Sequence, residues 1–106
     1  MISQETYFAL STPGGRSATA TIRISGPHSK NTILKLFKNK NKNLKPGFNH
    51  VVSLYNKNNN LIDKCVVVYY KGPKSVTGDD MVEIHTHGNP VIIDTVSKAL
   101  LDLGVR

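Results

Sequence analysis

Residues 80–104, DMVEIHTHGNPVIIDTVSKALLDLG, carry the pattern that decides the fold. Polar and apolar residues alternate over 80–87, which is the period of a half-buried strand. Asn89 and Pro90 follow in the positions of a helix cap and a first helical residue. The expected helix buries one apolar face, made of Ile92, Val96, Ala99, Leu100 and Leu103, and ends at Gly104. The stretch therefore predicts a strand that leads directly into an amphipathic helix.

Two further strand patterns precede this unit. Residues 18–25, ATATIRIS, alternate strictly, with alanine and isoleucine toward one face and polar residues toward the other. A shorter strand is expected over 5–11, before the turn-forming sequence STPGG. Arg23 belongs to the polar set of the longer strand, so we expect it on the polar face of an ordered sheet.

The middle of the chain predicts a helix and a hairpin. A short amphipathic helix is expected over 29–37, followed by a loop rich in lysine and asparagine. Strands over 49–55 and 61–70 are expected to form a hairpin around the asparagines of 56–60. The second strand is apolar on both faces over its later half, which is typical of a central strand covered on both sides. Together the patterns predict a single α+β domain with about five strands in a mixed or antiparallel sheet and two helices.

Positive charge dominates the composition. Fourteen Lys and Arg against seven Asp and Glu give the 106-residue chain a formal net charge of +7. Six lysines and no acid fall within residues 30–45, at Lys30, Lys35, Lys38, Lys40, Lys42 and Lys45. Two interpretations stay open: a surface loop biased toward Lys and Asn, or a tract that binds RNA. The arginines are more informative, because arginine is the usual residue for two-point recognition of phosphate or carboxylate.

Several protein classes are excluded by what the sequence lacks. The single cysteine, Cys65, cannot form an internal disulfide, and we expect a buried structural thiol in a cytoplasmic protein. No apolar run approaches the ~18 residues of a membrane span. The chain contains neither a GxxxxGK[ST] phosphate loop nor a GxGxxG motif. We therefore expect no GTP hydrolysis by this chain itself.

Three polar residues with chemical potential stand close together in the sequence. Glu83, His85 and His87 occur at every second position and are expected on one face of a strand. This face could bind a metal, be simply hydrated, or hold an organic ligand or a partner chain. Successive side chains on one face lie ~6.6 Å apart, so at most two of the three would reach one ion. We therefore expect no metal site from this strand alone.

An organic ligand gains support from the surrounding sequence. The expected helix N-terminus beside Gly88 presents unpaired N–H groups, and Gly78 allows a loop backbone to approach closely. Arg23 can pair with an anion, and Glu83 can accept two N–H bonds from an amino-pyrimidine edge. These features together predict a ligand with a hydrogen-bonding heterocycle and an acidic tail.

Two ordered blocks resemble a known family. They are ALSTPGGRSATATIRISGP at residues 9–27 and PKSVTGDDMVEIHTHGNP at residues 73–90. The blocks resemble the N-terminal domain of the tRNA modification GTPase family called MnmE or TrmE. That family shows a TPPGRGA-type turn before a strand ending in IRISG, and later SYTGED, a VEIH-type strand and HGG. The resemblance covers nearly the whole chain, although Asn89 replaces the second glycine of HGG.

The resemblance implies a fold and a ligand. The implied fold is that of the tetrahydrofolate-binding domains of aminomethyltransferases, and the implied ligand is a reduced folate of the 5-formyltetrahydrofolate type. Arg23 and Glu83 match folate contacts of the family, and both also emerge from the strand pattern. The other matching positions lie in the corresponding loops, at Arg16, Thr77, Gly78 and Gly88.

The resemblance also implies a larger parent enzyme. In the family this domain dimerises and precedes a helical domain and a G domain that uses GTP, potassium and magnesium. With the flavoprotein MnmG, the whole enzyme adds a carboxymethylaminomethyl-type group to C5 of the wobble uridine of tRNA. We therefore expect residues 1–106 to be a truncated N-terminal folate-binding piece without enzymatic activity of its own. The alternative is a small basic RNA-binding module that uses the tract from Lys30 to Lys45.

Overall fold

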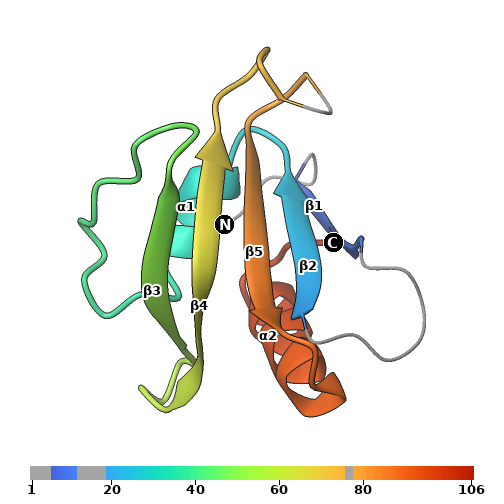
Figure 1. Cartoon of the computed structure of the whole chain (residues 1–106). Helices are drawn as coiled ribbons and strands as arrows, with labels where there is room; N and C mark the ends of the chain where they lie inside the picture. The colour runs from blue at the N-terminus through green and yellow to red at the C-terminus, as the bar shows by residue number, and fades with distance from the viewer. Residues whose placement is uncertain (1–5, 12–18, 76–77) are drawn as a thin grey trace.

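In the part of the chain that the structure describes, five strands form one antiparallel sheet (Figure 1). The structure is a computed structural model and describes residues 6–11, 19–75 and 78–106. Its strands are β1 (Tyr7–Leu10), β2 (Thr19–Ser25), β3 (Asn49–Tyr55), β4 (Leu61–Tyr70) and β5 (Met81–His87). They lie in the order β1-β2-β5-β4-β3, and two helices complete an α+β fold. The expected fold class is confirmed.

The strand from the deciding stretch, β5, lies in the middle of the sheet between β2 and β4. Its register with β2 places Arg23 opposite Glu83. The register with β4 places Val68 opposite the same glutamate. Residues directly opposite in neighbouring strands point to the same face, so three strands contribute side chains around Glu83.

The first helix, α1 (Ser29–Leu34), is shorter than the expected helix over 29–37. The N–H groups of Lys35, Leu36 and Phe37 donate to carbonyls three residues back, at 3.0–3.2 Å. These bonds continue the helix as tight turns, a common way for helices to end. Phe37 and Leu36 are still buried in the core, so the amphipathic pattern was right although the helix boundary was wrong.

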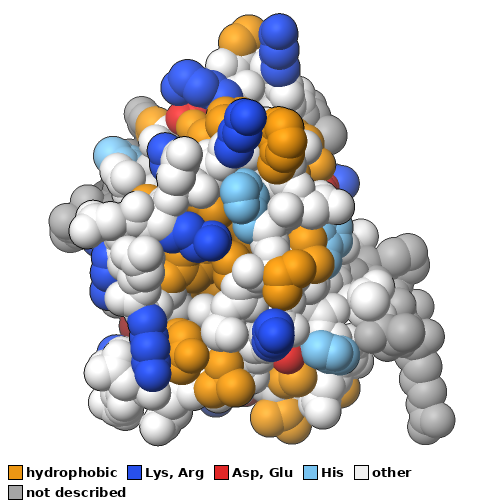
Figure 2. Space-filling model, turned by 60° about the vertical axis from the view of Figure 1, so that its left-hand side comes forward, with side chains coloured by type: hydrophobic (Ala, Val, Ile, Leu, Met, Phe, Trp, Pro, Cys, Tyr) orange, Lys and Arg blue, Asp and Glu red, His pale blue; other side chains and the backbone are white. Residues whose placement is uncertain are grey.

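The lysine tract beyond α1 is a loop held to the domain by Leu44, which is 1% exposed. The ammonium groups of Lys38 and Lys45 each lie 4.7 Å from the centre of an aromatic ring. Lys40 donates to two backbone carbonyls of the tract, both at 2.7 Å. Figure 2 shows Lys and Arg side chains dispersed over one face of the molecule, separated by apolar and uncharged side chains. Lys30, at the start of the tract, has its ammonium group 5.5 Å from the centre of the Tyr69 ring. Four of the six lysines of the tract therefore make contacts within the domain.

The second helix, α2 (Pro90–Asp102), begins as the sequence predicts. Asn89 is its N-cap, and the side-chain oxygen Oδ1 accepts a hydrogen bond from the Val91 N–H at 2.8 Å. Val96 and Leu100 are fully buried, and the expected neighbours Ile92, Ala99 and Leu103 pack against the core. Asn89, where the family pattern has a glycine, therefore has a structural role as a helix cap.

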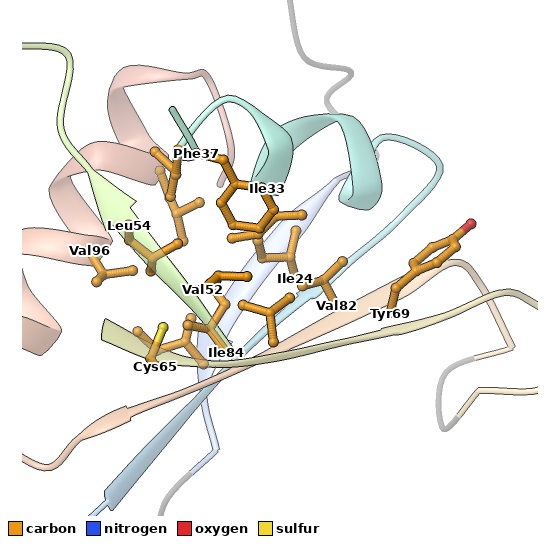
Figure 3. Packing of buried hydrophobic residues seen from close by; sticks show 14 of the residues in the cluster. Ile24, Ile33, Phe37, Val52, Leu54, Cys65, Tyr69, Val82, Ile84 and Val96 are labelled. Carbon is orange, nitrogen blue, oxygen red and sulfur yellow. The ribbon is translucent and has the colours of Figure 1, made fainter. Parts of the chain in front are cut away.

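Both helices lie on the same side of the sheet, and the hydrophobic core fills the space between the helices and the sheet (Figures 1 and 3). From the sheet this core takes every second residue, including Ile24, Val67 and Ile84. Within the described part of the chain, no helix lies over the opposite face. The expectation that β4 is covered on both sides was wrong in part: on the open face Val68 is 3% exposed, but Val66 and Tyr70 are only half-buried. The apolar run of β4 therefore indicates a strand with neighbours on both edges, and it does not indicate a covering layer on both faces of the sheet.

Candidate functional site

The centre of the open face is an ion pair between β2 and β5. Arg23 Nε donates to Glu83 Oε2 at 2.8 Å. The Glu83 side chain is 11% exposed and the Arg23 side chain 39% exposed. The structure therefore brings together the two residues that the strand pattern selected, and it buries the carboxylate more deeply than the guanidinium.

Neighbouring side chains complete the surroundings of the Glu83 carboxylate. Tyr70 on β4 donates its hydroxyl to Glu83 Oε1 at 3.3 Å. His85 Nε2 lies 3.4 Å from the same oxygen, and His85 Nδ1 lies 3.1 Å from the Thr21 hydroxyl. Three strands thus fix the position of one carboxylate. Sequence reasoning missed Tyr70, because only the pairing of β4 with β5 brings it to Glu83.

These contacts keep the carboxylate ionised. Burial alone would raise the pKa of Glu83, but the hydrogen bond and positive charge of Arg23 outweigh burial and hold this pKa below its usual value. Burial and the adjacent Glu83 charge raise the pKa of Tyr70, so its hydroxyl keeps its proton. The site therefore offers an anionic acceptor beside a neutral hydroxyl donor.

A cavity of about 450 Å³ opens beside this network. Its lining residues come from β4, β5 and the loop that joins them: Tyr70, Lys74, Ser75, Met81 and Glu83. One wall is aromatic, another is apolar, and a buried carboxylate and an exposed ammonium group provide opposite charges. Apolar walls with a few placed polar groups are typical of small-molecule sites.

The loop between β4 and β5 is tied down on both of its sides. Gly72 N–H donates to Asp80 Oδ1 at 2.9 Å, and Gly26 N–H donates to the Asp80 carbonyl at 2.9 Å. A Cβ at Gly72 would lie only 2.7 Å from the Gly78 carbonyl oxygen, so the two arms of the loop touch. Ser75 donates its hydroxyl to the Asp79 carbonyl. The described residues of the loop thus form a fixed wall of the cavity.

The predicted loop residues divide between the two ends of β5. Gly78, with φ +82°, belongs to the loop beside the cavity, whereas Gly88 follows the other end of the strand. The N-terminus of α2 is at the Gly88 end too, about 20 Å away along a seven-residue strand. Gly78 and Gly88 therefore do not meet around one ligand position. Arg16 and Thr77 lie outside the described residues.

His87 belongs to a different pair from the one at Glu83. The ring nitrogen Nδ1 of His87 lies 2.9 Å from Oδ1 of Asp63. The backbone N–H of His87 donates to Oδ2 of the same carboxylate at 3.1 Å. Among residues 6–11, 19–75 and 78–106, no three His, Cys, Asp or Glu side chains form a group that could hold a metal ion. The alternating strand therefore distributes its polar residues between two separate contacts.

Cys65 has the environment of a structural thiol. It lies 5% exposed in the core, and burial together with the nearby Asp63 charge raises its pKa to about 12. A thiol with such a pKa is protonated and unreactive at neutral pH. The expectation of a buried cysteine is confirmed.

No helix within the described residues is long and apolar enough to span a membrane.

Comparisons with known proteins agree with the motif pattern. Residues 6–106 match the family model described as the GTP-binding protein TrmE N-terminus. The chain is 42% identical to the tRNA modification GTPase MnmE of Legionella pneumophila (strain Corby) over 105 residues, which is 99% of this chain and 23% of that protein. The MnmE proteins of Fervidobacterium nodosum and Granulibacter bethesdensis are 42% and 39% identical, over 99% of this chain and 24% and 23% of their own lengths.

The extent of these matches determines what they establish. The chain spans about a quarter of the length of the curated relatives it matches. The family model, in contrast, covers both sequence blocks, all five strands and both helices. The cavity-lining carboxylate and its arginine partner lie within the matched region. By its motifs and by sequence comparison, the chain belongs to the TrmE N-terminal family of the tRNA modification GTPases.

Proposed function

We propose that the chain binds a reduced folate of the 5-formyltetrahydrofolate type in the cavity beside Glu83. The observation that carries this proposal is the buried, ionised Glu83 carboxylate, which Arg23 holds at the wall of that cavity. The amino-pyrimidine edge of a folate presents adjacent N–H donors, which a carboxylate can accept as a pair. When bound, the folate would supply a one-carbon unit.

The residues of the cavity fit such a heterocycle. An ionised carboxylate has about four lone-pair positions, and Arg23 and Tyr70 occupy one on each oxygen of Glu83. One position on Oε2 is then left for a ligand, and the second position on Oε1 is shared with His85 Nε2, which lies 3.4 Å away. Tyr70 and Met81 supply the aromatic and apolar surface that a flat ring can cover. The site therefore combines paired acceptors with apolar walls.

Arg23 has two functions in this proposal. Its Nε keeps the neighbouring carboxylate charged and in place, and its terminal nitrogens are further donors next to Glu83, although Arg23 itself does not line the cavity. The 39% exposure of its side chain leaves room for a ligand to contact those donors. Arg23 thus supports Glu83 directly and can also contact the ligand.

The family relation extends the proposal beyond the cavity. We propose that this chain is the folate-binding and dimerisation part of a cytoplasmic tRNA modification GTPase. The GTP, potassium and magnesium sites would belong to a G domain elsewhere in the whole protein. With a flavoprotein of the MnmG type, that enzyme would modify C5 of the tRNA wobble uridine.

A calorimetric titration of the chain with 5-formyltetrahydrofolate tests the central proposal. We expect Glu83→Gln to weaken binding at least about tenfold, because an amide offers one acceptor oxygen where the carboxylate offers two. Asp94→Asn is a matched control, since Asp94 is an exposed acid on α2 paired with Lys98. Absence of binding by the unaltered chain, or equal affinity of the Glu83 variant, would contradict the proposal.

RNA binding by the lysine tract is the competing function. The contacts of Lys38, Lys40 and Lys45 within the domain argue against a tract reserved for phosphates. Salt distinguishes the two functions, because binding through several phosphate contacts weakens by orders of magnitude between about 50 and 200 mM salt. Folate binding at one cavity should change only slightly over that range. A steep salt dependence of tRNA binding by the isolated chain would favour the competing function.

A further inference from the structure

We propose that Lys74 is the residue that recognises the acidic tail of the ligand and so discriminates among folates by tail charge. This inference deepens the folate-binding proposal and rests on it. It concerns the rim of the cavity, which neither the strand pattern nor the matching motifs assigned to a ligand. The chemistry that Lys74 would recognise is a carboxylate chain attached to a heterocycle.

The first argument is the position of Lys74 in the cavity. Lys74 and Glu83 line the same cavity of about 450 Å³, one from the loop and the other from β5. Their opposite charges can contact opposite ends of one ligand, a donor edge at Glu83 and an anion at Lys74. Tyr70 and Met81 line the same cavity and add aromatic and apolar surface to these two polar groups. The lining thus offers the three kinds of surface that a folate requires: an acceptor for its heterocycle, apolar surface for its rings and a cation for its tail.

The second argument is that the Lys74 ammonium group has no competing ionic partner among residues 6–11, 19–75 and 78–106. Among the ion pairs of the described residues, none involves Lys74. Arg23, the cation paired with Glu83, is not in the cavity lining and already uses its Nε on that carboxylate at 2.8 Å. An anion at the rim would therefore meet an available charge at Lys74 and a partly neutralised one at Arg23.

The third argument is the anchoring of the loop that carries Lys74. Lys74 N–H donates to the Lys71 carbonyl at 3.2 Å, so the residue belongs to a hydrogen-bonded turn. On either side of this turn the loop is held by the Gly72 bond to Asp80 and by the Ser75 bond to Asp79. The backbone of this loop is thus ordered when the domain folds, so ligand binding does not have to overcome the entropy of ordering it.

Lys71 provides a matched control. It is an exposed lysine in the same loop, three residues before Lys74, but it does not line the cavity. Replacing either lysine with alanine removes the same charge from the same loop. A general effect of loop charge would therefore appear in both variants, whereas a specific contact would appear only in Lys74→Ala.

The experiment measures three ligands by calorimetry on the unaltered chain, Lys74→Ala and Lys71→Ala. The ligands are 5-formyltetrahydrofolate, its counterpart without the glutamate tail, and its triglutamate form. We expect Lys74→Ala to weaken binding of the tailed ligands about three- to fivefold, as for an exposed ion pair, and to leave the tailless ligand unchanged. Lys71→Ala should leave all three affinities unchanged. Raised salt should reduce the advantage of the tail in the unaltered chain and not in Lys74→Ala.

Four results would overturn the inference. Lys74 does not recognise the tail if Lys74→Ala loses the same affinity for tailed and tailless ligands. The same conclusion follows if Lys74→Ala and Lys71→Ala lose equal affinity. Binding of every ligand with no effect of Lys74→Ala would remove the inference and leave the folate proposal intact. Failure of the unaltered chain to bind any of the three ligands would remove both. Circular dichroism of each variant confirms that the fold is retained.

Discussion

The two faces of the sheet come from the same strands and differ in almost every physical property. On the helix side, Ile22, Val82 and Ile84 are at most 1% exposed and make only apolar contacts. On the open side, Arg23 and Glu83 alternate with them along β2 and β5 and form the ion pair. Each site residue is therefore covalently next to a core residue. Packing on one face fixes the backbone from which the polar groups of the other face extend.

The largest effect should come from damaging the core face beside the site. Ile84→Ala removes most of a side chain that is 0% exposed at the centre of the sheet. We expect a loss of about 2–5 kcal/mol in the free energy of unfolding, measured by urea denaturation. Val51→Ala is the control, because Val51 is 65% exposed on β3 and should change stability by less than about 0.5 kcal/mol. Equal stability of Ile84→Ala and the unaltered chain would contradict the division between the faces.

Arg23→Ala should do the opposite and damage function with little effect on folding. Removal of the guanidinium takes away the charged donor of Glu83, so we expect folate affinity to fall about tenfold. The matched control is Lys64→Ala, which removes an exposed strand cation at the other end of β4 from Tyr70. Unchanged affinity in Arg23→Ala, with the fold retained, would remove Arg23 from the site.

Tyr70→Phe should have a smaller effect on binding. The substitution removes only the hydroxyl that donates to Glu83 Oε1 over a long 3.3 Å, and it keeps the aromatic wall. We expect affinity to fall about threefold, the range for one neutral hydrogen-bond donor. Tyr7→Phe tests the specificity of this effect, because Tyr7 is 53% exposed on the edge strand β1. A loss as large as that of Glu83→Gln would mean that Tyr70 contacts the ligand itself.

The smallest effect should come from pH, because burial offsets part of the influence of Arg23 on Glu83. The pKa of Glu83 is lower in the folded chain than its usual value of 4.5. The folded state therefore binds fewer protons at this group, and the resulting stabilisation is present above about pH 5. It is lost as pH falls through the lowered folded pKa. Melting temperatures from pH 7 to pH 3 should fall less steeply for Glu83→Gln than for the unaltered chain, and parallel curves would contradict this.

Strand periodicity was sufficient to select Arg23 and Glu83, because alternation separates polar from apolar residues within each strand. It could not show that β2 lies beside β5 or that their register makes the two residues opposite partners. That pairing depends on the tertiary arrangement of strands far apart in the sequence. Tyr70 and Lys74 were missed for the same reason, since only the return of the chain through the loop brings them to Glu83.

Helix boundaries and surface charge were predicted less well. The apolar spacing of Ile33 and Phe37 correctly predicted that both residues are buried. It did not predict where the helix ends, because the tight turns after α1 bury Phe37 as a longer helix would. The lysine tract was expected to be either a surface loop or an RNA-binding tract, and neither interpretation included its contacts with the domain, where Leu44 anchors it and Lys38 packs over an aromatic ring. Composition does not distinguish a solvated ammonium group from one that already has a partner.

The Arg23–Glu83 pair joins residues 60 positions apart in the chain. This long separation means that the pair cannot form locally and forms only when β5 joins β2 to close the sheet. Completion of the fold and completion of the site are therefore the same folding event. A ligand held by this carboxylate would bind only the closed sheet and would slow its opening in proportion to ligand concentration over the dissociation constant.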